Sequence, residues 1–301
     1  MAVAPRPLFH WKLRTRSLPL GTRTQIVGVL NVTPDSFSDG GLYFARESAI
    51  EHALRLLDEG ADILDIGGES TRPGDHPPLS AQQEIDRVVP IIAAVLQQRP
   101  QAILSIDTYK AQTAQAAVSA GAEIVNDVSG FLWDHAMAAT CASLGCGVLL
   151  MHTRGRPQEW RAQPPIPPQE IVPLVLRELA QRAQSARDAG VHQENIVLDP
   201  GLGFGKIGEE NYPLLANFDR LHALGYPLLV GASRKSFLTR TIQQATDQEP
   251  SPDARLHGTL AAHTAAILAG AHLIRVHDVA AARDAAAVAD AIRAAAKILH
   301  P

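Results

Sequence analysis

Hydrophobic positions along this chain gather in eight short runs, and each run ends in a small cluster of polar residues. The runs with their polar tails are IVGVLNVTPDSFSDGG (26–41), ILDIGGESTRPG (63–74), ILSIDT (103–108), EIVNDVSG (123–130), VLLMHTRG (148–155), IVLDPGLGFGK (196–206), LLVGASRKSF (228–237) and LIRVHDV (273–279). Short apolar runs bounded by turn residues are typical of strands that are buried on both faces. A buried strand does not require charged residues just beyond its end, so we expect these residues to carry chemistry at one common end of a sheet.

Segments with helical periodicity separate the apolar runs. In 46–59, Ile50, Leu54 and Leu57 share one face at helical spacing. Ser80 is placed to act as an N-cap, with Gln83 at the capping-box position. The other helices are expected at 80–97, 110–119, 134–144, 168–189, 210–223, 253–269 and 279–299.

Six glycines mark the joints between these helices and the next strands. They are Gly60, Gly121, Gly145, Gly190, Gly225 and Gly270. A glycine just after a helix favours a left-handed C-cap conformation. Alternating strands and helices imply a parallel α/β sheet with right-handed crossovers. Eight such units favour closure into a (β/α)8 TIM barrel of one domain over an open sheet.

The chain divides into an N-terminal extension, residues 1–24, and a barrel catalytic domain, residues 25–301. Two segments lack a strand or helix pattern. The Pro-rich segment 154–170 is expected to be a long loop, and 239–253 a second flexible insertion. Each segment is either a solvated linker or a lid or dimer edge, because long loops in compact domains are often functional.

Charge and composition exclude several classes of protein. The 301 residues carry a net charge of −4, which gives no electrostatic basis for binding nucleic acid or an anionic membrane. No apolar run is long enough to predict a membrane span, and the first residues lack the apolar core of a secretory signal. Cys141 and Cys146 have no partner at metal-ligand spacing, which favours reduced structural thiols and a cytoplasmic protein.

One group of polar residues has the chemistry of an anion site. Thr71 and Arg72 follow a strand and a pair of glycines, and Arg275 and His277 end the eighth strand. Small residues let backbone N–H groups approach an anion, and arginine offers a planar fork of donors. Arg72 alone fits an ordinary surface turn equally well. The basic residues of two different strands together predict a diphosphate site.

A second group is suited to reading a flat polar ring. Asp107, Asn126, Asp199 and Lys235 lie at the ends of four different strands. A buried carboxylate can accept two N–H bonds from a guanidine-like edge, while asparagine and lysine read carbonyl and ring nitrogen atoms. The alternative is an Asp199–Lys235 pair that holds the barrel mouth together. Met151 covers a ring face or simply fills the core.

The first loop carries candidate ligands for a hard cation. Asn31 offers a carbonyl oxygen to Mg²⁺, which usually keeps several waters and shares substrate phosphates. The alternative is turn chemistry, since Asn-x-Thr-Pro-Asp also starts loops well. Asp35 and Asp39 fit either reading.

Taken together, the tails of the runs resemble the dihydropteroate synthase family, the sulfonamide targets of folate biosynthesis. NVTPDSFSDGG (31–41) and GGESTRPG (67–74) resemble its two signature loops. The remaining blocks follow in the family's order, namely SIDT (105–108), NDVSG (126–130), MHTRG (151–155), DPGLGFGK (199–206), SRKSF (233–237) and RVHDV (275–279). The resemblance covers about residues 25–280, and the combination is specific where no single block is.

The resemblance implies a transferase that joins 6-hydroxymethyl-7,8-dihydropterin diphosphate to 4-aminobenzoate, with Mg²⁺ as cofactor and a homodimer as assembly. It assigns the pterin to Asp107, Asn126, Asp199, Lys235, Met151 and Phe204. It assigns the diphosphate to Thr71, Arg72, Arg275 and His277, the aminobenzoate to Phe37, Thr71, Pro73, Lys235 and Ser236, and Mg²⁺ to Asn31. The residues expected to be catalytic are Asp107, Lys235, Arg275 and Arg72.

The chemistry of these substrates favours an S_N1-like path. Diphosphate leaves readily once Mg²⁺ and two arginines neutralise it, and the cation left on the pterin methylene is conjugated with an electron-rich ring beside Asp107. Two alternatives remain: a pterin-binding methyltransferase, which needs neither the STRPG loop nor the SRKSF pair, and a non-catalytic pterin-binding paralogue. The second alternative is disfavoured because Asn31, Arg72 and Arg275 are all present.

Overall fold

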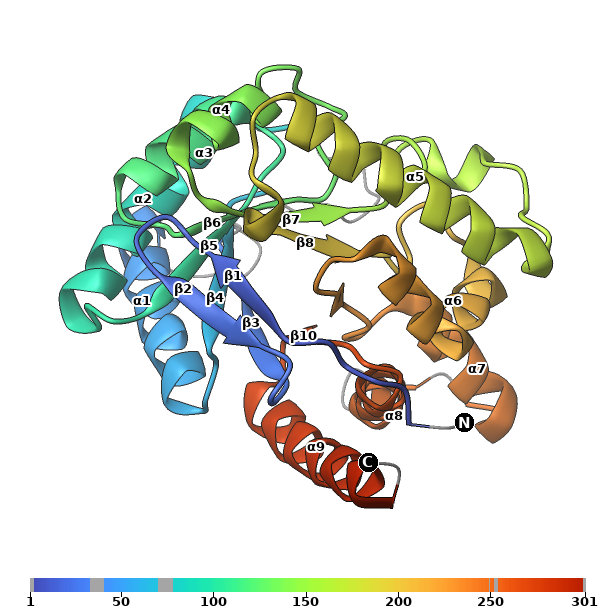
Figure 1. Cartoon of the computed structure of the whole chain (residues 1–301). Helices are drawn as coiled ribbons and strands as arrows, with labels where there is room; N and C mark the ends of the chain where they lie inside the picture. Colours follow the sequence, from blue (N-terminus) through green and yellow to red (C-terminus); the bar gives the residue numbers. More distant parts are fainter. Residues whose placement is uncertain (1–2, 33–40, 70–77, 249, 252–253, 300–301) are drawn as a thin grey trace.

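Eight parallel strands form a nearly closed barrel with helices around it, which confirms the predicted TIM barrel (Figure 1). The computed structural model describes residues 3–32, 41–69, 78–248, 250–251 and 254–299. The barrel strands are β3 (Gln25–Asn31), β4 (Ile63–Gly67), β5 (Ile103–Asp107), β6 (Ile124–Asp127), β7 (Gly147–Met151), β8 (Ile196–Asp199), β9 (Leu229–Val230) and β10 (Leu273–Val276). Their order is β8-β7-β6-β5-β4-β3-β10-β9, and a parallel bridge between Leu198 and Leu228 brings β8 to the start of β9.

Helices cover the outside of the barrel. They are α1 (Gly41–Asp58), α2 (Ala81–Gln98), α3 (Ala111–Ser119), α4 (Met137–Leu144), α5 (Pro168–Asp188), α6 (Tyr212–Ala216), α7 (Ser236–Thr246), α8 (Ala254–Leu268) and α9 (Val279–Leu299). Four 3₁₀ turns complete the described elements: Trp160–Ala162, Gln193–Asn195, Gly208–Asn211 and Phe218–Leu224. None of the helices in the described ranges is both long and apolar enough to cross a membrane.

The capping box and the joint glycines predicted at the helix ends are present in the structure. The Ser80 side chain accepts a bond from the Gln83 backbone, and the Gln83 side chain reaches back to Ser80, which completes the capping box. All six joint glycines have positive φ, between 61° and 114°. At Gly121 a Cβ atom would lie 2.4 Å from a Leu96 methyl carbon, so both the backbone conformation and the packing require glycine there.

Two predicted elements are wrong. The helix expected at 210–223 is broken into two 3₁₀ turns and the short α6, because the Asn217 side chain bonds the Pro213 carbonyl and competes with the helical backbone. The insertion expected at 239–253 is mostly helical, since α7 runs to Thr246. This helix is anchored by Phe237 and Leu238, which are buried, whereas most of its later residues are exposed and gave no apolar periodicity.

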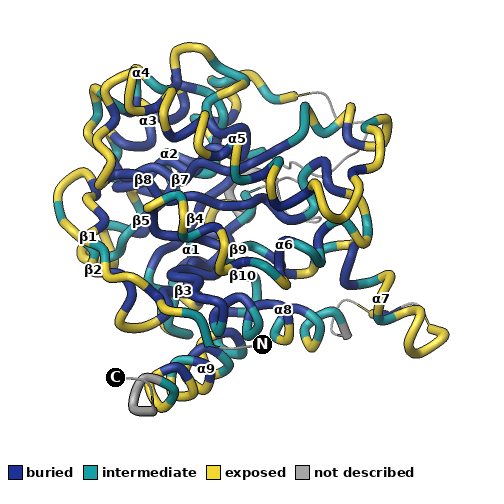
Figure 2. The backbone as a smooth tube through the Cα atoms, turned by 45° about the vertical axis from the view of Figure 1, so that its right-hand side comes forward, coloured by how far each residue is buried: buried dark blue, intermediate teal, exposed yellow. Residues whose placement is uncertain are grey.

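Strand alternation divides the apolar core into two clusters. Side chains pointing outward pack against the helices, while those pointing inward fill the floor of the barrel. The inward cluster comprises Val27, Ile63, Ile103, Ile124, Leu149, Val197, Leu229 and Leu273. Figure 2 shows the buried strands at the centre of the molecule and the exposed backbone at its edge.

The N-terminal extension closes the barrel floor. Strands β1 (Phe9–Lys12) and β2 (Ser17–Leu20) form an antiparallel hairpin, and its Trp11 packs on the inward apolar cluster with no exposed surface. The Trp11 indole Nε1 donates to the Asn195 carbonyl at 2.8 Å, between the hairpin and the start of β8. The hairpin therefore completes the core on which the inner layers of the barrel rest.

Replacing Trp11 with alanine should lower the free energy of unfolding by about 3–5 kcal/mol, because it opens a cavity under the barrel. Trp11→Phe keeps most of the packing and loses only the indole hydrogen bond, so its cost should be smaller, about 1–3 kcal/mol. Urea unfolding followed by circular dichroism measures both values. Equal losses in the free energy of unfolding for the two variants would show that the packing of the Trp11 ring on the barrel floor does not stabilise the fold.

Candidate active site

The polar residues of the site lie directly above the apolar floor on the same inward faces. Two positions beyond the floor residues, the strands carry Asp65, Ser105, Asn126, Met151, Asp199, Gly231 and Arg275 on their inward faces. Two positions further on, Asn31, Gly67 and Asp107 follow on β3, β4 and β5, where they are neighbours in strand register. The period of a strand thus stacks a polar layer on an apolar one at the carboxyl end of the barrel, where TIM barrels place their sites.

Arg275 forms the centre of this layer. Its Nε donates to Asp65 Oδ2 and its Nη2 to Asp107 Oδ2, both at 2.7 Å. Asn126 Nδ2 donates to the same Asp65 oxygen at 2.8 Å. The Asp65 side chain is fully buried and that of Arg275 is 22% exposed, so a buried carboxylate holds a guanidinium that solvent partly reaches.

Sequence reasoning missed Asp65. It lies inside the apolar run ILDIG, whereas the predicted site residues come from the polar tails. The signal was nonetheless present, because a charged residue in the middle of a buried strand must be paired or bind a ligand.

Two of the predicted carboxylates are poised between their charged and neutral forms. Burial raises the pKa of Asp107 to about 7, against the opposing effect of Arg275, because the nearby Asp65, Glu84 and Asp127 carboxylates also disfavour a further negative charge. Burial likewise raises the pKa of Asp199 to about 6, although the Gly201 N–H donates to it at 2.7 Å. A ligand that donates hydrogen bonds or carries positive charge would stabilise the charged form of both carboxylates.

Lys235 and Phe204 meet across the mouth of the barrel. The Lys235 Nζ lies 3.8 Å from the centroid of the Phe204 ring. The Phe204 ring contacts Trp160 edge-on, with 5.1 Å between centroids, and Trp160 belongs to the Pro-rich segment 154–170. This segment therefore packs against a predicted site residue, which favours a functional loop over a plain linker.

The turn before α7 is held in an uncommon conformation. Arg234 has a φ of +58°, and this left-handed backbone is supported by a bond from its N–H to Thr259 and an ion pair with Asp278. On one side of the turn, Ser233 Oγ lies 2.9 Å from His277 Nδ1. On the other side, Lys235 is the N-cap of α7 and Ser236 its exposed first residue. The turn thus fixes Ser233 against His277 and Lys235 at the start of α7.

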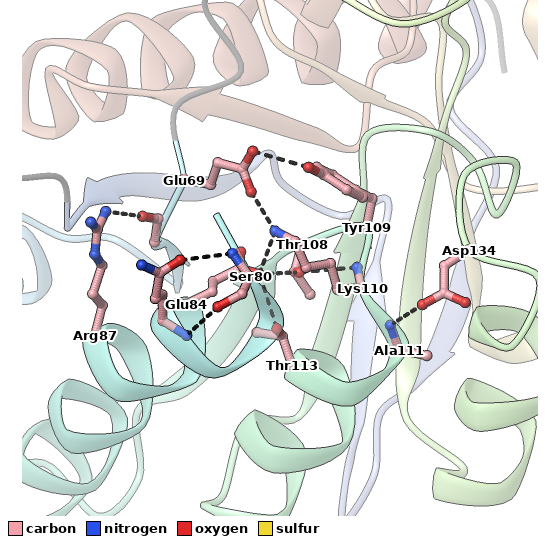
Figure 3. A network of polar contacts seen from close by, with 12 residues as sticks. Glu69, Ser80, Glu84, Arg87, Thr108, Tyr109, Lys110, Ala111, Thr113 and Asp134 are labelled. Atoms are coloured by element: carbon pink, nitrogen blue, oxygen red, sulfur yellow. Dashed lines mark hydrogen bonds and ion pairs between the residues drawn. The ribbon is translucent and has the colours of Figure 1, made fainter. Parts of the chain in front are cut away.

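A second polar network fixes the strand end that carries Asp107 (Figure 3). Glu84 of α2 is 1% exposed and accepts from Thr108 Oγ1 at 3.0 Å, Thr113 Oγ1 at 2.9 Å and Lys110 Nζ at 3.0 Å. The Lys110 ammonium also pairs with Glu69, at the carboxyl end of β4. Because each charge in the network is paired, the backbone just after Asp107 is rigidly placed.

Several predicted residues fall outside the described part of the chain. Phe37, Thr71, Arg72 and Pro73 lie there, as do Asp35 and Asp39. Their assigned roles in binding diphosphate and aminobenzoate stay predictions.

The donor set near Asn31 fits a magnesium ion that keeps most of its own waters. A Cβ atom on Gly67 would lie 3.8 Å from Asn31 Oδ1 and 3.7 Å from Asp107 Oδ2, so the absence of a side chain leaves room between two oxygens. The described ranges contain no cluster of three or more histidine, cysteine or acidic side chains placed to hold a metal ion. Mg²⁺ suits such a sparse site, because substrate phosphates commonly complete its coordination.

Comparison with known proteins defines the class to which this site belongs. A family model described as pterin binding enzyme matches residues 27–277. The dihydropteroate synthase of Clostridium beijerinckii is 40% identical over 282 residues, which are 93% of this chain and 98% of that protein. These two matches place the chain among the pterin-binding enzymes.

Solved structures narrow the class further. Xanthomonas albilineans dihydropteroate synthase with 4-aminobenzoic acid superposes with a TM-score of 0.84 at 41% identity, covering 95% of this chain and 99% of that one. The same synthase in complex with 7,8-dihydropteroate gives a TM-score of 0.77 at 40% identity, covering 92% and 96%. The chain belongs to the dihydropteroate synthase family, whose members are transferases of folate biosynthesis.

Asp65→Asn should lower kcat/KM by about 10²-fold, because the guanidinium loses its buried charged partner and the amide offers only one acceptor oxygen. The assay is formation of dihydropteroate, with folding checked by circular dichroism. Asp62→Asn is the matched control. Asp62 also pairs with an arginine, Arg23, at 2.6 Å, but it lies just before β4 at the opposite end of the strand from the site. If both variants lost activity equally, Asp65 would have no special role.

Proposed function

We propose that the chain joins 6-hydroxymethyl-7,8-dihydropterin diphosphate to 4-aminobenzoate and releases 7,8-dihydropteroate and diphosphate. The observation that carries this proposal is the Arg275 guanidinium lying 2.7 Å from both Asp65 and Asp107 at the carboxyl end of the barrel. This arrangement places the Arg275 cation, which can bind the departing diphosphate, beside the Asp107 carboxylate, which can stabilise positive charge on the pterin. The 4-aminobenzoic acid and the 7,8-dihydropteroate bound to the Xanthomonas synthase, one substrate and the product of this reaction, support the proposal.

The pterin is read by the buried polar layer. Asp199 accepts from the guanidine-like edge of the ring, while Asn126 and Lys235 contact its carbonyl and ring nitrogens. Met151 and Phe204 cover the ring. Because Asp199 is buried and its pKa is raised to about 6, two ligand N–H donors stabilise its charged form and orient the ring at the same time.

The leaving group is bound on the other side of the polar layer. Arg275 gives one N–H to Asp65 and one to Asp107, and the remaining donors of its guanidinium are available to a diphosphate oxygen. His277, Thr71 and Arg72 complete the anion site. Mg²⁺ held by Asn31, when bound, supplies further neutralisation of the diphosphate charge.

Bond breaking precedes bond making in this proposal. The bond between the pterin methylene carbon and the diphosphate oxygen breaks, and the electron pair leaves with the oxygen. The Asp107 carboxylate stabilises the cation that remains on the pterin. The neutral amine of 4-aminobenzoate, held by Phe37, Thr71, Pro73, Lys235 and Ser236, then adds to the carbon and releases a proton. A weakly basic arylamine loses that proton readily, so no strong base is required.

The homodimer and the cytoplasmic location stay predictions. On α9, the large apolar side chains Val288 and Ile292 are exposed one helical turn apart, at 63% and 46%, as an interface on the last helices requires. Sedimentation equilibrium measures the assembly directly.

Purified protein with dihydropterin diphosphate, Mg²⁺ and 4-aminobenzoate should release diphosphate and form dihydropteroate together. Arg275→Ala should slow both by about 10²–10³-fold, because the leaving anion loses its buried cation. Arg283→Ala is the matched control, since Arg283 pairs with Asp284 on the exposed face of α9.

Tight pterin binding without diphosphate release in the wild type would contradict the synthase proposal. It would favour the methyltransferase or the non-catalytic paralogue instead. Turnover that survives in Arg275→Ala would keep the reaction but remove Arg275 from the anion site.

A further inference from the structure

A network of buried and half-buried polar side chains lies behind the pterin-reading layer, and the reaction proposed above does not use it. It links Lys206 in the loop after β8, His152 just after β7, and Glu178 and Arg182 of α5. Lys206 is 2% exposed and His152 not at all. Strands β7 and β8 are paired neighbours in the barrel, with α5 outside them (Figure 1).

The Lys206 ammonium is bound by acceptors from both strand ends. Its Nζ lies 2.9 Å from His152 Nδ1, 3.1 Å from the Phe204 carbonyl and 3.4 Å from the His152 carbonyl. An ammonium has three N–H donors, so these three acceptors satisfy it completely. A buried lysine without such partners would be strongly destabilising.

These contacts fix the ring of His152. His152 Nδ1 is one of the three partners of Lys206 Nζ, and at the other edge of the ring Nε2 lies 3.0 Å from Glu178 Oε2. Burial, with a further contribution from the nearby Lys206, lowers the pKa of His152 to about 3, so the ring is neutral. The imidazole is therefore enclosed between the buried lysine and Glu178 of α5.

Arg182 ties down the same segment from the outside. Its two terminal nitrogens donate to the Met151 carbonyl at 2.7 Å and to the Thr153 carbonyl at 2.9 Å. Together with Lys206, buried cations bond three successive carbonyls, those of Met151, His152 and Thr153. A backbone that leaves a strand while still buried needs such partners, because buried carbonyls must be hydrogen-bonded.

The clamped segments are those that carry the ring-reading residues. Met151 directly precedes His152, and the Phe204 carbonyl is a Lys206 acceptor. The His152 N–H also donates to the Asp199 carbonyl at 2.9 Å. At Gly201, with φ of +63°, a Cβ atom would lie 1.9 Å from the His152 carbonyl oxygen, so the two segments are in direct backbone contact.

We propose that Lys206 and His152 are positioning residues for pterin recognition, which hold Met151, Asp199 and Phe204 in one geometry around the ring. The inference rests on the proposed function, because it assigns those three residues to the pterin. Neither side chain touches the substrate. Their effect is on the affinity for the pterin and not on the affinity for 4-aminobenzoate, whose predicted residues lie on other loops.

Two substitutions of His152 separate its two contacts. In His152→Asn the side-chain oxygen stands close to the former Nδ1 and can still accept from Lys206, whereas in His152→Gln only the donor toward Glu178 is kept. Lys206→Met removes the ammonium. Lys12→Met is the matched control, since Lys12 pairs with Glu194 and is exposed at the barrel floor.

The readouts are the dissociation constant for a pterin bearing a 6-carboxylate, measured by calorimetry, and the KM for 4-aminobenzoate at saturating pterin diphosphate. Lys206→Met and His152→Gln should weaken pterin binding by about 10-fold or more, the equivalent of one charge-assisted hydrogen bond. Their KM for 4-aminobenzoate should change less than about 2-fold. His152→Asn and Lys12→Met should bind the pterin as the wild type does.

Equal weakening by His152→Asn and His152→Gln, or equal effects on both substrates, would overturn the inference and leave only a structural role. If Lys206→Met fails to fold, the comparison of the two His152 variants decides the question alone. A wild type that binds no pterin would instead contradict the proposed function, so the two failures are distinguishable.

Discussion

The interaction on which the site depends is the single guanidinium of Arg275 held between the carboxylates of Asp65 and Asp107. Two carboxylates share one cation there, with Asp65 fully buried, Asp107 13% exposed and Arg275 22% exposed. This imbalance has a cost, because buried charges are stable only when they are paired. The excess of carboxylates also makes the site complementary to a ligand that develops positive charge. Preorganised charges contribute most to catalysis when they face charge that develops in the transition state.

The same strand geometry builds both the core and the site. On each barrel strand one residue packs on the floor formed with Trp11, and two positions further on the inward face carries the polar layer on most strands, with Val29 at that position on β3. Networks of hydrogen-bonded polar side chains then fix the polar layer from outside. Glu84 and Lys110 hold the end of β5, and Lys206, His152 and Arg182 hold the ends of β7 and β8. Preorganisation is thus a property of the strand ends and not of the loops alone.

The sequence was sufficient for the barrel and for part of the site. Eight apolar runs and six joint glycines predicted the fold, and the polar tails predicted one site at the strand ends. They assigned Arg275 to an anion group and Asp107 and Asn126 to a ring-reading group, so the contacts that join the two groups were not predicted. Asp65 was missed because it interrupts an apolar run, and Lys206 and His152 because their partners lie on other strands. Pairing of that kind depends on strand order, which local spacing does not encode. The helix α7 was missed because its exposed residues hide the two buried ones, Phe237 and Leu238.

The central claim is that this field ionises the pterin–oxygen bond before the amine reacts. Positional isotope exchange tests it most directly, with ¹⁸O placed in the oxygen that bridges the pterin methylene and the diphosphate, and with 4-aminobenzoate left out. Reversible ionisation lets the departed phosphate group rotate, so the label should move into non-bridging positions in recovered substrate. Unscrambled label in an enzyme that turns over normally when 4-aminobenzoate is added would contradict the account.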